Sequence, residues 1–214
     1  MPSYYPAGPE DYNIEFEIDT TDNTITITGF SVILTIPSHL VIPNTIEYLG
    51  GEFPVVAIAD GAFETEPGIE SVTINSNLQS IGARAFKWTY SLHTIVFPSP
   101  SSLTSIGDEA FRNTGISSIT FPASIETIGA YAFSQGQGGY ELHGTVTFEG
   151  SSESNGGNLK SIGAHAFDPI SSNNEYDNSA WTSSDPIIPD WLVSMGVQQN
   201  ESSASGDPYV SPFF

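Results

Sequence analysis

Few side chains in this sequence have the types and spacing that catalysis or metal binding requires. The four histidines, His39, His93, His143 and His165, show neither an H-x-x-x-H nor an H-E-x-x-H spacing, so they predict no metal site. His165 occupies a variable place in a repeated motif and is expected on the surface. The sequence has no G-x-S-x-G motif and no other Ser/His/Asp grouping that would indicate a nucleophile.

Adjacent acids and a glycine-rich stretch are two further candidates, and each has a simpler structural explanation. We expect a short helical turn in which Asp108 is the cap, Glu109 suits the positive end and Arg112 suits the negative end. The stretch GQGG resembles the start of a phosphate-binding loop, but it has no glycine at the third glycine position of that motif. It also lacks the helix start and the lysine. The chain has no cysteine, which excludes disulfides and thiol chemistry. We therefore predict no enzymatic activity, no metal and no cofactor.

The charge of the chain restricts its partners. Four Lys and Arg against 25 Asp and Glu give a formal net charge of −21, which would repel nucleic acid and anionic membrane surfaces. Such acidity most often serves solubility, although calcium or a basic protein surface would also fit it. The first residues have neither the basic region nor the apolar run of a secretion signal, and no apolar stretch approaches the roughly 18 residues needed to span a membrane. We expect a chain that is soluble where it is made, or an export or anchoring segment outside it.

A six-residue motif recurs along the chain and predicts its architecture. Each copy follows an alternating segment of the SITF type at a similar offset. Repetition at 20–30 residues is the signature of a solenoid, in which each unit buries its apolar side against its neighbours. The copies are IADGAF at Ile58, IGARAF at Ile81, IGDEAF at Ile106, IGAYAF at Ile128 and IGAHAF at Ile162.

Each repeat contains residues for a strand, a return path and a turn. The alternating segment predicts a short strand with one apolar face, which Pro98 and Pro122 end in two of the copies. The glycine of the motif allows a change of direction or a close neighbour, and its Ala and Phe would form a packed small/large column. The predicted inward strand residues are Val72/Ile74, Ile95/Phe97, Ile119/Phe121 and Val146/Phe148, and those of the return path are Leu78/Ile81, Leu103/Ile106, Ile125/Ile128 and Leu159/Ile162.

The pattern LxxIxFP followed by LxxIGxxAF resembles the BspA-like, or Treponema pallidum-type, leucine-rich repeat. The match is close over residues 58–167, and the segment from Ser31 looks like a first, looser repeat in which TIP ends a strand. The resemblance implies a strand-dominated solenoid and a surface or secreted protein that attaches to matrix proteins, cells or other microbes. The family often has Cys three residues after the motif Phe, whereas this chain has Glu66, Thr89, Thr114 and Gly136. Thr is a small polar replacement that should preserve the turn.

The ends of the chain differ from the repeats and suggest three parts. IEFEI and TITIT flank DTTDN and predict a β-hairpin, so residues 1–32 are expected to form an N-terminal tail and a capping hairpin. Residues 33–167 would hold the leucine-rich repeats, with loops at the Gly/Ser-rich inserts of the last two. Residues 168–214 would form a C-terminal cap and tail in which Trp191 to Val193 cover the last coil; the alternative is a truncated neighbouring domain.

The outward side of the strands is the candidate binding surface. It is almost uncharged and rich in Ser and Thr, in a protein of net charge −21. One explanation is that β-branched Thr favours strands; another is a concave surface that binds a protein or glycan through many shallow contacts. An ice-binding Thr ladder fits less well because Val96 and the insertions interrupt it. The candidate residues are Ser71, Thr73, Thr94, Val96, Ser118, Thr120, Thr145 and Thr147, with Thr35 joining from the first unit.

These observations predict a leucine-rich-repeat solenoid of about six coils, dominated by strands, with short helical turns on its convex side and a cap at each end. The predicted function is non-enzymatic binding of a protein or glycan at the cell surface or outside the cell, without nucleic acid or membrane insertion. The alternative is a structural spacer that displays other domains and has no ligand of its own.

Overall fold

The computed structural model describes residues 3–6, 12–32, 37–134, 146–149, 158–163 and 165–167. These residues form strands and turns and no helix. The strands are β1 (Ser3–Pro6), β2 (Tyr12–Asp19), β3 (Thr24–Val32), β4 (His39–Val41), β5 (Thr45–Tyr48), β6 (Gly51–Ile58), β7 (Ser71–Thr73), β8 (Ser80–Ile81), β9 (Thr94–Val96), β10 (Ser105–Ile106), β11 (Ile119–Phe121), β12 (Thr127–Ile128), β13 (Val146–Phe148) and β14 (Ser161–Ile162).

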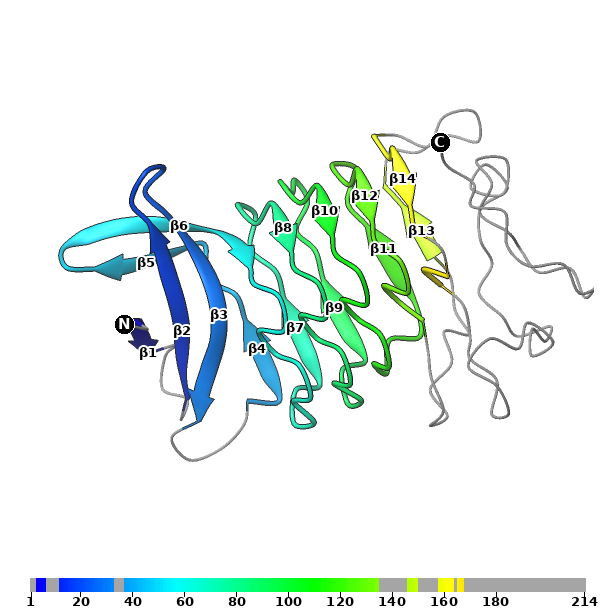
Figure 1. Cartoon of the computed structure of the whole chain (residues 1–214), viewed down its shortest axis with the longest axis horizontal. Coiled ribbons are helices and arrows are strands. Elements are labelled where there is room, and N and C mark those ends of the chain that lie inside the picture. The colour runs from blue at the N-terminus through cyan, green and yellow to red at the C-terminus, as the bar shows by residue number, and fades with distance from the viewer. Residues whose placement is uncertain are drawn as a thin grey trace, which may run out of the picture.

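The repeats stack side by side as coils, and each coil gives one short strand to each of two layers (Figure 1). The first layer is a sheet in the order β1-β2-β3-β6-β8-β10-β12-β14, to which β5 adds by pairing with β6. Its pairing is parallel from β3 to β14, and the motif isoleucines Ile58, Ile81, Ile106, Ile128 and Ile162 lie in register. The second layer holds β4-β7-β9 and β11-β13, both parallel. The register confirms the repeat assignment.

The core lies between the two layers and contains a stack of phenylalanine rings. The phenylalanine column consists of Phe63, Phe86, Phe111, Phe133 and Phe167, which are all buried. Successive ring centroids are 5.0, 5.2, 5.0 and 5.7 Å apart, with interplanar angles of 5° to 16°. The alanine before each of the last four phenylalanines is also buried. The small/large column predicted from the motif is therefore present among the described repeats.

The turns of the motif are not the short helical turns that we predicted. Glu109 has φ 58°, and the equivalent Arg84, Tyr131 and His165 have φ between 56° and 60°, which is the left-handed region. The backbone N–H of Phe111 donates to the carbonyl of Ala132 on the next coil, at 2.7 Å, instead of to a carbonyl in its own turn. The same bond joins the other coils. Because the turns bond from coil to coil, no helix forms here.

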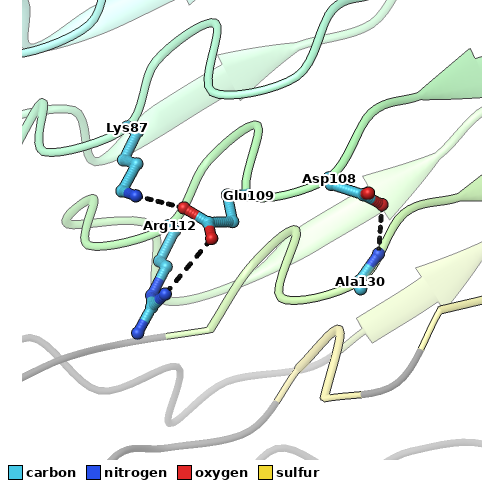
Figure 2. Close-up of polar contacts among 5 residues, drawn as sticks. All are labelled: Lys87, Asp108, Glu109, Arg112 and Ala130. Atoms are coloured by element: carbon cyan, nitrogen blue, oxygen red, sulfur yellow. Dashed lines mark hydrogen bonds and ion pairs between the residues drawn. The ribbon is translucent and has the colours of Figure 1, made fainter.

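Asp108 likewise bonds to a neighbouring coil instead of capping a helix. Its Oδ1 accepts a hydrogen bond from the N–H of Ala130 at 2.8 Å (Figure 2). Asp60 accepts in the same way from the N–H of Ala83, at 2.7 Å. These carboxylates therefore fix the spacing between coils.

The motif glycines are required by close approach between coils. A Cβ on Gly107 would lie 2.6 Å from the backbone N of Ala83, and one on Gly163 would lie 2.2 Å from the backbone N of Ala130. Neither glycine has a positive φ. Of the two roles we predicted for this glycine, the close neighbour is the one that applies.

The predicted N-terminal hairpin is formed by β2 and β3, which pair antiparallel with Tyr12 opposite Val32. β3 then pairs in parallel with β6, so the hairpin extends the first layer at its edge. In its turn, the backbone N–H groups of Thr21 and Asp22 lower the pKa of Asp19, whose Oδ1 lies 2.7 Å from the Thr21 nitrogen.

Several predicted features lie outside the described residues. They are the inserts at 135–145 and 150–157 and the proposed C-terminal cap and tail at 168–214. The three-part division at residues 32 and 167 remains a prediction.

Candidate ligand-binding face

Along the strands of the second layer, side chains point alternately to the core and to solvent. Leu40, Val72, Ile119 and Val146 are buried, as the period-two pattern predicts, while their neighbours along the strands point outward. We call the outward residues the strand face. Its described members are His39, Val41, Ser71, Thr73, Thr94, Val96, Ser118, Thr120 and Thr147.

The structure brings most of the predicted site residues together in two groups. On β7 and β9, Ser71 is opposite Thr94, and Thr73 is opposite Val96. On β11 and β13, Thr120 is opposite Thr147. Ser118 is exposed directly before β11. Thr145 and Thr35 lie outside the described residues.

Sequence reasoning missed the first strand of this face. We took TIP at residues 35–37 as the end of the first strand, but the strand that pairs with β7 is His39–Val41. Pro43 follows it at the place that Pro98 and Pro122 hold after later strands, which is the signal that would have identified it. His39 contributes a side chain whose Nδ1 lies 2.6 Å from Ser71 Oγ and whose Nε2 lies 3.3 Å from Thr73 Oγ1.

An apolar row crosses the first group. Val41, Thr73 and Val96 are in register across β4, β7 and β9. The two valines, which are the last residues of β4 and β9, are 45% and 47% exposed. β4, β7 and β9 carry no Asp, Glu, Lys or Arg.

A groove separates the two groups of strands. β9 and β11 belong to separate sheets and are not hydrogen-bonded as neighbouring strands. The centroids of the Phe97 and Phe121 rings are 6.3 Å apart, compared with 4.8 Å for Phe121 and Phe148. The groove has a volume of about 290 Å³. It is lined by Ile95, Val96, Phe97, Ser118, Ile119, Thr120 and Glu149. It therefore combines an apolar floor, two hydroxyls and one carboxylate.

The other layer has a longer and larger groove, of about 670 Å³. Successive coils line it with the same residue types, such as Ser80, Ser105, Thr127 and Ser161 beside the motif glycines. Its two acids, Asp60 and Asp108, are already bonded to backbone N–H groups. Within the described part of the chain, no three His, Asp or Glu side chains are placed to share a metal ion.

Two basic side chains near the motif turns, Lys87 and Arg112, are held by structural contacts. Glu109 pairs with Lys87 and lies 3.4 Å from Arg112 Nη1 (Figure 2). Partial burial raises the pKa of Glu109, but the hydrogen bonds and charges of Lys87 and Arg112 outweigh it and lower the pKa below its usual 4.5. Lys87 also lies over the ring of Trp88, at 4.4 Å from its centroid. The cluster stabilises the stacked turns.

A family model for the BspA type leucine-rich repeat region matches residues 56–174 in six copies. The chain belongs to the BspA-type leucine-rich repeat family. No curated protein matches the chain. Among solved structures, the leucine-rich repeat protein of T. pallidum is 24% identical with a TM-score of 0.57, over 78% of this chain and 67% of that one. A leucine-rich repeat protein of Bacteroides capillosus is 28% identical with a TM-score of 0.53, over 69% and 99%. The pneumococcal vaccine antigen PcpA is 22% identical with a TM-score of 0.56, over 79% and 48%.

The BspA-type repeats of this chain use threonine where cysteine often stands in the family. Thr89 and Thr114 are buried, and their hydroxyls donate to the carbonyls of Phe63 and Phe111 at 3.0 Å. Both buried hydroxyls therefore have a hydrogen-bond acceptor, Thr89 on the preceding coil and Thr114 within its own turn. Glu66 occupies the same place in an earlier repeat, where partial burial raises the pKa of its carboxyl.

No helix among the described residues is long and apolar enough to cross a membrane.

Proposed function

We propose that this protein is a non-enzymatic, cell-surface or secreted adhesion module that binds a protein, cell or glycan ligand through the strand face. The observation that carries the proposal is the composition of that face. Its exposed side chains are hydroxyls, two valines and one histidine, in a chain of net charge −21. Repeat proteins use such extended surfaces for binding through many separate contacts.

The contacts of the face support binding more than a purely structural role. Thr and Val both favour strands in any sheet, but Val41 and Val96 also expose apolar surface that a ligand could remove from water. Val96 also borders the groove between β9 and β11, so the row continues into a concavity with an apolar floor. A ligand that covers the row and fills the groove would bury both.

Family membership supports the proposed location. BspA-type leucine-rich repeat proteins are typically surface or secreted proteins, and PcpA, which shares the fold, is described as a vaccine antigen of pneumococcus. Fold alone does not determine a ligand. The specific proposal therefore rests on the strand face.

The test is binding of the purified protein to an array of extracellular-matrix proteins and glycans. A variant with Val96→Glu and Thr120→Glu adds two charges to the walls of the groove, where both side chains point to solvent. We expect an arrayed ligand that binds the natural protein and is lost in this variant. Circular dichroism should show that the variant remains folded.

A matched control separates the position of the charge from its amount. Gln79→Glu with Lys160→Gln lowers the net charge by the same two units beside β8 and β14, in the other layer. This control should bind like the natural protein. If nothing on the array binds, or if both variants lose binding equally, the face is not the binding surface and the spacer function becomes the better explanation.

A further inference from the structure

The hairpin of β5 and β6 carries two features that oppose its own stability. It projects from the N-terminal end of the stack in the view of Figure 1. The strands pair antiparallel with Tyr48 opposite Gly51, which leaves Leu49 and Gly50 as a two-residue turn. Their φ angles are 49° and 79°, so both residues are left-handed, as a type I′ turn requires.

Leucine is an unfavourable residue for this turn. A left-handed backbone is costly for residues with a Cβ, and type I′ turns prefer Asn or Asp before Gly. Leu49 is nevertheless placed there with its side chain 90% exposed. In the β2–β3 turn, the same chain places Asn23 at its left-handed position, with φ 53°. Other described turns also place residues with a Cβ in the left-handed region, including Arg84 and Trp88, but Leu49 is the aliphatic member of this set and its side chain is almost fully exposed.

The second unfavourable feature is a pair of like charges next to the turn. Glu47 and Glu52 lie directly opposite each other on the two strands, and both are exposed. Like charges in a cross-strand pair are destabilising. Thr45 Oγ1 donates to Glu52 Oε1 at 2.6 Å, which holds one of the carboxylates in place beside its partner.

The base of the hairpin is fixed, so the tip is presented in a defined position. Ile46 is buried, and Phe53, opposite it, packs against the core. The Tyr48 ring meets Phe16 of β2 edge-on, with centroids 5.8 Å apart. A rigid tip loses little conformational entropy when it binds.

We propose that the β5–β6 hairpin is a second interaction surface, on which Leu49 inserts into an apolar pocket of a partner protein whose rim is basic. The pocket removes the exposed leucine from water, and Lys or Arg side chains on the rim neutralise Glu47 and Glu52. The acidic charge of the chain disfavours an anionic membrane and a second copy of this chain as the occupant. This surface is separate from the strand face.

Two single variants make the proposal testable. Leu49→Asn creates the preferred Asn-Gly turn, so it should raise the Tm by roughly 2–4 °C. The same change removes the leucine side chain that is proposed to insert into the partner. Asn23→Leu is the matched control, because it creates an exposed leucine at the left-handed position of the other hairpin. It should lower the Tm and leave binding unchanged.

The experiment measures binding of the natural protein and both variants to an array of purified basic matrix and serum proteins. We expect a basic protein whose affinity falls about 10- to 100-fold for Leu49→Asn, the amount that burial of one leucine supplies, and is unchanged for Asn23→Leu and for Val96→Glu with Thr120→Glu. Glu47→Gln should slow association at low salt.

Three results would overturn the proposal. The first is that no arrayed basic protein depends on Leu49. The second is Leu49-dependent retention on phosphatidylcholine vesicles containing phosphatidylserine, or Leu49-dependent self-association, which would identify a membrane or a second copy instead. The third is a lower Tm for Leu49→Asn, which would make the leucine a structural residue.

Discussion

Replacement of Phe111 by alanine should be among the most damaging single changes in this protein. Phe111 is fully buried in the middle of the phenylalanine column, 5.2 Å from the Phe86 ring and 5.0 Å from the Phe133 ring. Truncation of a buried phenylalanine costs about 3–5 kcal/mol through lost transfer energy and the cavity that remains. For a chain of this size, that corresponds to a fall in Tm of roughly 6–20 °C.

Phe111 should matter more than a ring at the edge of the stack. Phe30 on β3 is only half buried and stacks on Phe63 at 5.6 Å, so Phe30→Ala should cost about 1–2 kcal/mol. Phe111→Leu keeps most of the volume and should cost about 1.5 kcal/mol or less. The expected order of stability is therefore natural protein, then the two milder variants, then Phe111→Ala.

The assay is urea unfolding followed by circular dichroism, with the slope of the transition compared among variants. Stacked repeats need not unfold in one step, so a broadened transition for Phe111→Ala would indicate that the coils on its two sides have uncoupled. A cost for Phe111→Ala below about 1 kcal/mol, or equal to that of Phe30→Ala, would refute the conclusion that the column couples the coils.

Three further changes test other contacts. Gly107→Ala would place a Cβ 2.6 Å from the backbone N of Ala83, so thermal unfolding should show a loss of about 1–3 kcal/mol; an unchanged Tm would contradict close approach as the reason for this glycine. Glu109 has a lowered pKa, so it stabilises the fold above the usual carboxyl pKa of 4.5 and this contribution disappears as the pH falls through the folded value. The Tm difference between the natural protein and Glu109→Gln should accordingly shrink in acid, and a pH-independent difference would speak against the ion pair. Glu66 has the opposite shift, because burial raises its pKa. Glu66→Gln should therefore raise the Tm at neutral pH, with a gain that declines as the pH falls through the raised pKa; a lower Tm at neutral pH would show that the charge is favourable.

The repeat architecture could be predicted because each of its signals is local and recurs. The alternation of Ile119, Thr120 and Phe121 marks a strand with one buried side, and the Ala-Phe pair marks the packed turn. The five copies fix the register, since equivalent residues of neighbouring coils must lie opposite each other. The pairing of Ile106 with Ile81 and Ile128 confirms this reasoning.

The turn conformation could not be predicted in the same way, because its hydrogen-bond partners are distant in sequence. Asp108 and Glu109 have the residue types of a helix start, and a reading confined to neighbours along the chain favours a helical turn. In the structure, Asp108 bonds to Ala130 and Glu109 pairs with Lys87, each more than 20 residues away. Contacts between coils override the local preference.

The sequence predicted the central strands of the candidate face but not its first strand, β4. The β7 and β9 residues followed from the repeat, whereas β4 lies in the loosest unit, where two successive segments end in Ile-Pro. The groove between β9 and β11 has no sequence signal of its own, because it depends on how far two coils separate. Leu49 was also missed, since its significance lies in its backbone angle and exposure.

The affinity of one charged variant at the groove tests the proposed function most directly. For a ligand found on the matrix and glycan array, the dissociation constants of the natural protein, Val96→Glu and Gln79→Glu would be compared by biolayer interferometry at physiological salt. Both variants add one negative charge, but only the first adds it to the strand face. The proposed function predicts a loss of at least about tenfold for Val96→Glu and none for Gln79→Glu. Equal affinities for the two variants would contradict binding through the strand face.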